Sequence, residues 1–290
     1  MSQRPPEPAA ADDPRVEAFR RLLGVTDRLR DADGCPWDLE QTESSMAPFL
    51  VEEAHELVEA IETESAKDAA GEAGDVLGGL LILCRIAEQG GRYDLAQVAN
   101  TSAEKFVRRH PHVFADAAGG DAATVLKQWN EIKQEERELK GETADSSALS
   151  GIPKALPALQ RATRTCDKAV DAGFSWPTMR GALAKIHEEL AELEAELPNG
   201  ILDQPFGTAP PAAARDRVVA ELGDLLLSGA YFARYLDLDP EAACRAAVRR
   251  FDERFRRMET VVGGTTRGVD LDTLEAAWNA EKAHDAPRTS

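Results

Sequence analysis

The sequence has 290 residues, of which 43% are hydrophobic and 30% are charged. This length is typical of two domains, and the apolar fraction is large enough to form hydrophobic cores. The formal net charge is −18, from 34 basic and 52 acidic residues. A charge of this sign repels phosphate backbones and anionic lipids, so we expect neither a nucleic acid nor a membrane surface as a partner.

The chain shows no sign of a membrane span or a secretory signal. Its longest apolar run, Val76 to Cys84, is far shorter than the roughly 20 residues that a spanning helix needs. The first 13 residues are rich in proline and alanine, and we interpret them as a loose tail. The four cysteines are widely spaced and form no CxxC pair. Such cysteines are typical of reduced thiols, so we expect a cytoplasmic protein.

Helix-forming residues dominate the chain, and apolar residues recur at a spacing near 3.6. This spacing places apolar side chains on one face of a helix. Alternating runs rich in valine, threonine and tyrosine are scarce, so we expect no sheet. We therefore predict an all-α fold. One series with helical spacing comprises Phe49, Leu50, Ala54, Leu57, Val58 and Ile61.

Breaks rich in glycine and proline separate the predicted helices. The most polar break, GETADSSALS at 141–150, has the composition of an interdomain linker. The predicted organisation is a disordered tail at 1–14, a helical domain at 15–140, a linker at 141–151, a second helical domain at 152–284 and a tail at 285–290.

The two predicted domains carry similar motifs in the same order. HEELAEL at 187–193 matches VEEAHEL at 51–57, an offset of 188 − 52 = 136 when both glutamate pairs are aligned. ELGDLLL at 221–227 matches EAGDVLG at 72–78, an offset of 221 − 72 = 149. The segment 198–211 supplies an insertion that accounts for the difference of 13. We therefore predict two copies of one helical unit.

Each copy carries five carboxylates on two successive predicted helices. Residues three or four positions apart share a helix face, so Glu52 and Glu53 both lean toward Glu56. Glu72 and Asp75 follow one turn apart on the next helix. Two antiparallel helices would gather these groups into one cluster. The second copy repeats the set with Glu188, Glu189, Glu192, Glu221 and Asp224.

A solvated helix face is the ordinary explanation for a single acidic motif of this kind. Here, however, Asp75 leads directly into the apolar run Val76–Leu83, and Asp224 leads into Leu225–Leu227. A helix that is apolar nearly all round is expected to be buried, and clustered carboxylates out of water require protonation or a cation. Because the ligands are all oxygen atoms, we predict that each copy holds Mg²⁺, or Mn²⁺ in its place.

A ferritin-like di-iron oxidoreductase would also use clustered carboxylates, but it requires Glu-x-x-His on two helices. Glu52 and His55 satisfy this pattern once, and the second copy has no histidine at the matching position. We therefore interpret His55 as structural or peripheral. His110 and His112 flank a proline and are expected to shape the turn that ends a helix.

Basic residues and tryptophans follow the acidic motifs in both copies. Lysine and arginine beside a carboxylate-bound metal form the combination that a polyphosphate site requires, although surface basic residues often pair with nearby acids instead. The tryptophans could stack on a base or pack in a core. Glu253 stands where the first copy has Arg108, which weakens the second basic set. The candidate substrate-binding residues are Lys105, Arg108, Arg109, Trp129 and Lys133 in the first copy, and Arg250, Arg254, Trp278 and Lys282 in the second.

Taken together, these motifs resemble the MazG family of nucleoside triphosphate pyrophosphohydrolases in its two-repeat form, over about residues 15–284. The resemblance is carried by GCPWDLEQT (34–42), VEEAHEL (51–57), GEAGD (71–75), RRHPHVFAD (108–116), WNEIKQEER (129–137) and GVDLDTLEAAW (268–278). It implies two tandem MazG-like helical domains with a four-helix-bundle core, and a homodimer whose packing completes the sites. The implied activity is Mg²⁺-dependent hydrolysis of a nucleoside triphosphate to a monophosphate and pyrophosphate, which clears non-standard or excess nucleotides.

The roles of individual residues follow from this resemblance by position. The ten carboxylates would hold metal, and the basic residues and tryptophans would meet the triphosphate. Glu53 or Glu189 would accept the proton of the attacking water, although adjacent carboxylates exchange such roles easily. A non-catalytic regulator or interaction protein, which binds nucleotide without turnover, is the alternative function.

Overall fold

The computed structural model describes residues 7–115, 119–139, 147–198, 200–204 and 210–284. These residues form twelve α-helices and one short 3₁₀ helix, with no strand among them, which confirms the all-α prediction. None of the described helices is long and apolar enough to cross a bilayer. The structure does not describe most of the predicted linker or the final tail. Parts of the N-terminal tail and of the insertion at 198–211 also lie outside the described residues.

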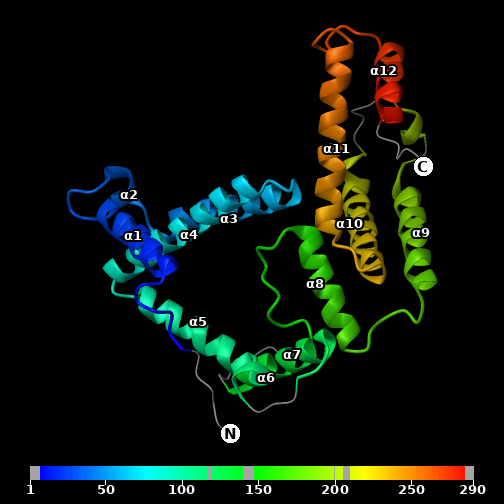
Figure 1. The fold of residues 1–290 in the computed structure, drawn as a ribbon. Coiled ribbons are helices and arrows are strands. Elements are labelled where there is room, and N and C mark those ends of the chain that lie inside the picture. The colour runs from blue at the N-terminus through cyan, green and yellow to red at the C-terminus, as the bar shows by residue number, and fades with distance from the viewer. Residues whose placement is uncertain (1–6, 116–118, 140–146, 199, 205–209, 285–290) are drawn as a thin grey trace. The chain divides into compact units, whose positions relative to one another are not determined.

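Contacts divide the chain into two units, Met1–Thr143 and Ala144–Ser290. Figure 1 shows the helices of both units. Those of the first unit are α1 Pro14–Leu29, α2 Pro36–Glu40, α3 Glu43–Glu62, α4 Ala66–Gln89, α5 Leu95–Arg109, α6 Pro111–Phe114 and α7 Ala122–Leu139. Those of the second are α8 Ala158–Asp171, α9 Met179–Glu196, η1 Ile201–Asp203, α10 Ala212–Tyr235, α11 Pro240–Val261 and α12 Leu271–His284.

The first unit is built around a hairpin of α3 and α4. Thr42 begins α3 with a capping box, in which its hydroxyl accepts from the Ser45 amide at 3.1 Å and the Ser45 hydroxyl accepts from the Thr42 amide at 2.9 Å. The turn before α4 is only three residues long, and Glu64 within it has a left-handed φ of 58°. Because the connection is so short, the two helices lie antiparallel and side by side (Figure 1).

The ends of α1 and α4 are joined by Arg30. Its guanidinium donates to the Gln89 side chain at 2.8 Å and to the Asp38 carbonyl of α2, and Gln89 donates back to the Arg30 carbonyl at 3.0 Å. A side chain at Gly34 would collide with the Leu29 carbonyl, so the tight turn before α2 requires glycine. These contacts place the 34–42 motif beside the start of α3.

The second unit is centred on α10, which packs against α8, α9 and α11. Its core is formed by Cys166, Ala182 and Tyr231, one from each of α8, α9 and α10. The Trp176 ring stands edge-on to Tyr231 with centroids 4.6 Å apart, so this tryptophan belongs to the core. All four cysteines are free thiols, as predicted.

The prediction that the apolar runs after the acidic motifs are buried is only partly correct. Leu81 is buried, but Leu77 and Leu80 on the same helix are 37% and 39% exposed. On α10, Leu226 is 54% exposed and Leu227 is 42% exposed. The reason is that the described helices packed against each acidic helix, namely α1, α3 and α5 around α4 and α8, α9 and α11 around α10, leave part of its apolar surface uncovered.

Candidate functional site

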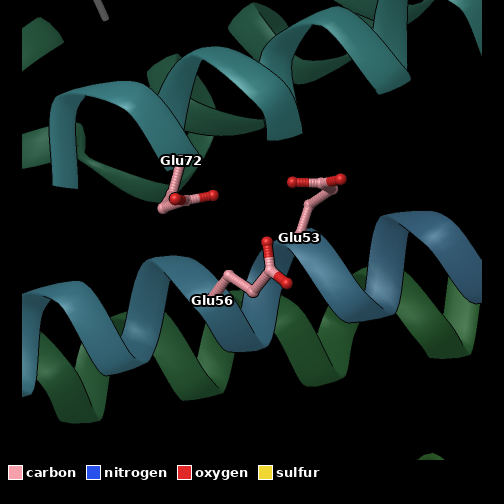
Figure 2. Close-up of side chains that lie close together, drawn as sticks. All are labelled: Glu53, Glu56 and Glu72. Atoms are coloured by element: carbon pink, nitrogen blue, oxygen red, sulfur yellow. The ribbon is translucent and has the colours of Figure 1, made fainter. Parts of the chain in front are cut away.

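The first acidic cluster forms across the interface between α3 and α4. Glu53 and Glu56 project from α3, and Glu72 projects toward them from α4 (Figure 2). One carboxylate oxygen of each residue lies within 4.8 Å of the others. Glu53 and Glu72 are half-buried and Glu56 is exposed. The spacing predicted this juxtaposition, because Glu53 and Glu56 share a helix face and the hairpin brings Glu72 opposite.

Mutual repulsion in this cluster disfavours the ionised carboxylates. Burial raises the pKa of Glu53, and the charges of Glu56, Asp75 and Glu52 raise it further. Burial likewise raises the pKa of Glu72, with Glu56 and Asp75 the largest charged contributors. Glu52 and Asp75 therefore border the cluster and act on it electrostatically, although the three closest groups are those drawn in Figure 2.

The second acidic cluster joins α9 to α10. Glu189, Glu221 and Asp224 each place a carboxylate oxygen within 4.8 Å of the others. Glu189 is buried, with 4% of its surface exposed. Glu192 lies nearby, because Glu189, Glu188 and Glu221 all raise its pKa in addition to the effect of burial.

Lys185 is a member of the second cluster that the sequence analysis did not identify. Its Nζ lies 2.6 Å from Oε1 of Glu189 and 2.9 Å from Oε1 of Glu188. The spacing of three and four residues along α9 was a usable signal for this pairing. Glu188 therefore pairs with Lys185 at the border of the cluster, and it is not one of the three carboxylates that converge there.

Both clusters suit a divalent cation. Their donors are carboxylate oxygens on two helices, which is the donor set that Mg²⁺ and Mn²⁺ prefer. In the first cluster, the raised pKa values of Glu53 and Glu72 express a repulsion that a bound cation would relieve. His55 is exposed and belongs to neither cluster, in line with its interpretation as peripheral.

The predicted basic residues of the first unit lie on α5 and α7. Arg108 and Arg109 both bind Glu136 of α7, at 2.5 and 2.6 Å. Arg109 and Lys133 lie over the Trp129 ring, 5.1 and 5.0 Å from its centroid. Figure 1 shows α5 leading away from the α3–α4 hairpin toward α7.

Lys105 is half-buried and lines a shallow hollow along α5 with Tyr93 and Thr101. The helix ends at Arg109, and His110 occupies its C-cap position before Pro111 begins α6. His110 therefore lies at the helix end, where its Nδ1 is 2.7 Å from the Phe106 carbonyl oxygen, and His112 lies within α6.

The second unit arranges its basic residues in a similar way on α11 and α12. The Arg254 guanidinium lies 4.9 Å from the centroid of the Trp278 ring, and the Phe251 ring lies 5.0 Å away. Arg250 and Lys282 are exposed on the same two helices. Both tryptophans thus contact a basic side chain, and their stacking on a base remains a prediction.

Glu136 is the second residue that the sequence analysis missed. It is 27 and 28 residues from the two arginines that it binds, so no helical spacing relates the partners. Its side chain is only 12% exposed, and the Arg109 hydrogen bonds lower its pKa to about 2, with Arg108 contributing.

Comparisons with known proteins agree with this architecture. Residues 41–114, which include the first acidic cluster, match the family model described as the MazG nucleotide pyrophosphohydrolase domain. A nucleoside triphosphate pyrophosphohydrolase of Escherichia coli strain K12 is 38% identical over 269 residues, covering 91% of this chain and 97% of the relative. The chain belongs to the MazG family.

Two further relatives are similar to most of this chain. The nucleoside triphosphate pyrophosphohydrolase/pyrophosphatase MazG of Thermotoga maritima is 36% identical, covering 92% of this chain and 96% of the relative. The uncharacterized protein YabN of Bacillus subtilis is 33% identical over 91% of this chain, which corresponds to 51% of that relative. The similarity therefore extends over both acidic clusters of this MazG-family chain.

Proposed function

We propose that this chain hydrolyses nucleoside triphosphates to a nucleoside monophosphate and pyrophosphate. The observation that carries the proposal is the convergence of Glu53, Glu56 and Glu72 from two facing helices onto one point. The names of relatives that match nearly the whole chain support the same reaction. Clearance of non-standard or excess nucleotides in the cytoplasm is the cellular role that this reaction would serve.

The proposed cofactor is Mg²⁺, with Mn²⁺ as a substitute. When bound, such an ion lowers the pKa of a coordinated water and neutralises phosphate charge. The proposed ligands are Glu52, Glu53, Glu56, Glu72 and Asp75 in the first unit, and Glu188, Glu189, Glu192, Glu221 and Asp224 in the second.

Glu53 and Glu189 are the proposed general bases, each acting in this role when its carboxylate is not bound to the metal. In this role a carboxylate oxygen accepts a proton from the water that attacks the α-phosphorus in line, and pyrophosphate leaves on the opposite side. The raised pKa of Glu53 supports its assignment, because a base works best when its pKa approaches the operating pH.

The proposed phosphate-binding groups are the basic residues of α5 and α7 and of α11 and α12. In the first unit, phosphate oxygens would be bound by Lys105, Arg108, Arg109 and Lys133. In the second unit, they would be bound by Arg250, Arg254 and Lys282. Trp129 and Trp278 would bind the base.

A homodimer would complete these sites. Helix α5, which carries three of the basic residues, leads away from the α3–α4 hairpin toward α7 (Figure 1), and a second copy could bring basic residues of its own to that hairpin. The exposed apolar side chains on α4 and α10 support an interface on these helices, since large apolar patches mark interaction sites.

Product analysis tests the proposed reaction directly. The intact chain is incubated with Mg²⁺ and a panel of triphosphates in water enriched in ¹⁸O. We expect pyrophosphate as the first product, with the label in the monophosphate because water attacks the α-phosphorus. Orthophosphate as the first product, or label in the pyrophosphate, would reject the reaction. A non-catalytic regulator would bind nucleotide and release no product.

A further inference from the structure

An ion pair between Arg257 of α11 and Glu281 of α12 joins the last two helices of the second unit. The Arg257 Nε donates to Oε2 of Glu281 at 2.9 Å. The Glu281 side chain is only 14% exposed, and Arg257 is half-buried. A carboxylate so far removed from water is costly unless a cation neutralises it. Arg257 therefore restricts where Glu281, and the part of α12 that carries it, can lie.

Both partners of this pair stand beside residues of the proposed nucleotide site. Arg257 follows Arg254 by three residues on α11, and Glu281 lies between Trp278 and Lys282 on α12. The Arg254 guanidinium lies 4.9 Å from the centroid of the Trp278 ring. Residues three apart on a helix are neighbours, so the ion pair fixes the two helices close to where the guanidinium meets the ring.

The first unit joins the corresponding helices with a carboxylate at a different position. Glu136 of α7, which is nearly buried, binds Arg108 and Arg109 of α5. When the tryptophans of the two units are aligned, 278 − 129 = 149, Glu281 corresponds to Ile132. Each unit thus pairs a carboxylate of its last helix with an arginine of a preceding helix, and the Glu281 pair is particular to the second unit.

The charge of Glu281 and its position have opposite effects on a bound anion. A carboxylate beside Lys282 repels phosphate, so the loss of its charge alone would strengthen phosphate binding. Arg257 largely cancels that charge at 2.9 Å, and what remains is screened by salt. Position should therefore outweigh charge, because a site whose groups are held in place before binding spends less free energy on ordering them.

We infer that Glu281 is a positioning residue that, through Arg257, holds Trp278 and Lys282 in place for the nucleoside triphosphate. The inference rests on the proposed substrate-binding role of the second unit. Loss of the Glu281 charge should weaken nucleotide binding there about tenfold, although the change makes the site less negative. A residue that acted only through its charge would change the affinity in the opposite direction.

Nuclear magnetic resonance of the intact chain, labelled with ¹⁵N in its indole groups, tests this inference. A panel of α,β-methylene nucleoside triphosphates with the four common bases is titrated in Mg²⁺, and the tightest binder is used. The Trp278 signal, assigned with Trp278→Phe, gives the dissociation constant of the second unit. The Trp176 ring packs against Tyr231 in the core of the same unit, so its signal shows whether each variant is folded.

Glu281→Gln should raise the dissociation constant about tenfold and leave the Trp176 signal unchanged. Asp272→Asn is the matched control, because it removes one negative charge from an exposed position on the opposite face of α12. This control should bind the analogue within about twofold of the wild type, since an exposed charge has little influence.

Arg257→Gln breaks the same pair from α11 and should cause a similar loss. Its combination with Glu281→Gln should weaken binding no further, because both changes remove one shared contact. The double variant leaves neither charge unpaired, so it keeps the test valid where a single variant fails to fold.

A folded Glu281→Gln or double variant that binds the analogue as tightly as the wild type, or more tightly, overturns the inference and leaves the proposed function standing. A wild-type chain whose Trp278 signal responds to none of the analogues overturns substrate binding by the second unit as well.

Discussion

Glu136 illustrates how single residues of this chain control the groups proposed to bind phosphate. It binds Arg108 and Arg109 together, and Arg109 in turn lies over Trp129. The carboxylate therefore fixes two guanidinium groups and, through one of them, the position of an indole ring. Because α5 and α7 pack against each other, this small network also joins the two helices.

We predict that the contribution of Glu136 to stability depends on pH. Its pKa is lowered to about 2 in the folded state, so its stabilising effect is complete above the unfolded-state pKa and is lost as pH falls toward 2. Glu136→Gln should lower the free energy of unfolding by about 2 kcal/mol at pH 7, and the loss should shrink steadily below about pH 4.5. Urea denaturation at a series of pH values measures both quantities.

The matched control for this prediction is Glu131→Gln on the same helix. Glu131 faces Lys127 at 3.9 Å, and both side chains are largely exposed, so its loss should have little effect at any pH. A Glu136→Gln variant that is as stable as the wild type at pH 7, or equally destabilised at pH 7 and pH 3, would contradict the account.

At the scale of elements, each pair of acidic helices leaves part of its apolar surface exposed. One face of α10 carries three exposed apolar side chains at helical spacing. They are Val219, which is 61% exposed, Leu222, which is 46% exposed, and Leu226, which is 54% exposed. Three large apolar side chains in a row on a helix face are expected to be covered in the working protein. This stripe is where we expect a second copy of the chain to pack.

Leu226→Glu should therefore weaken self-association by tenfold or more, because it places a charge in the proposed interface. Sedimentation velocity of the intact chain over a range of concentrations measures the effect. Leu202→Glu in η1, a 77% exposed position, is the control and should associate like the wild type. A wild-type chain that remains monomeric, or a Leu226→Glu variant that dimerises normally, would contradict an interface on α10.

Helical spacing was sufficient to predict much of the site. The acidic motifs lie on neighbouring helices because Glu53 and Glu56 are one turn apart and a three-residue turn brings Glu72 opposite. The exposure of Leu77 and Leu80 was not predictable, since composition shows that a face is apolar but not which surface covers it. The long-range contact of Glu136 was likewise beyond any local pattern.

At the scale of the whole molecule, the two units carry similar acidic clusters with different neighbouring residues. Both join carboxylates across two packed helices, and both lay an arginine over a tryptophan. They differ at Lys185 and Phe49, and at Glu253 and Arg108. A duplicated unit can diverge in this way because each copy holds its own cluster.

We propose that carboxylates converging from facing helices make the chain a metal-dependent hydrolase. The most direct measurement is pyrophosphate release in Mg²⁺ by a variant that combines Glu72→Gln with Glu221→Gln, which removes one charge from each cluster. With helical circular dichroism unchanged, we predict a fall of at least about 100-fold relative to the wild type. A folded double variant that releases pyrophosphate at the wild-type rate would contradict the account.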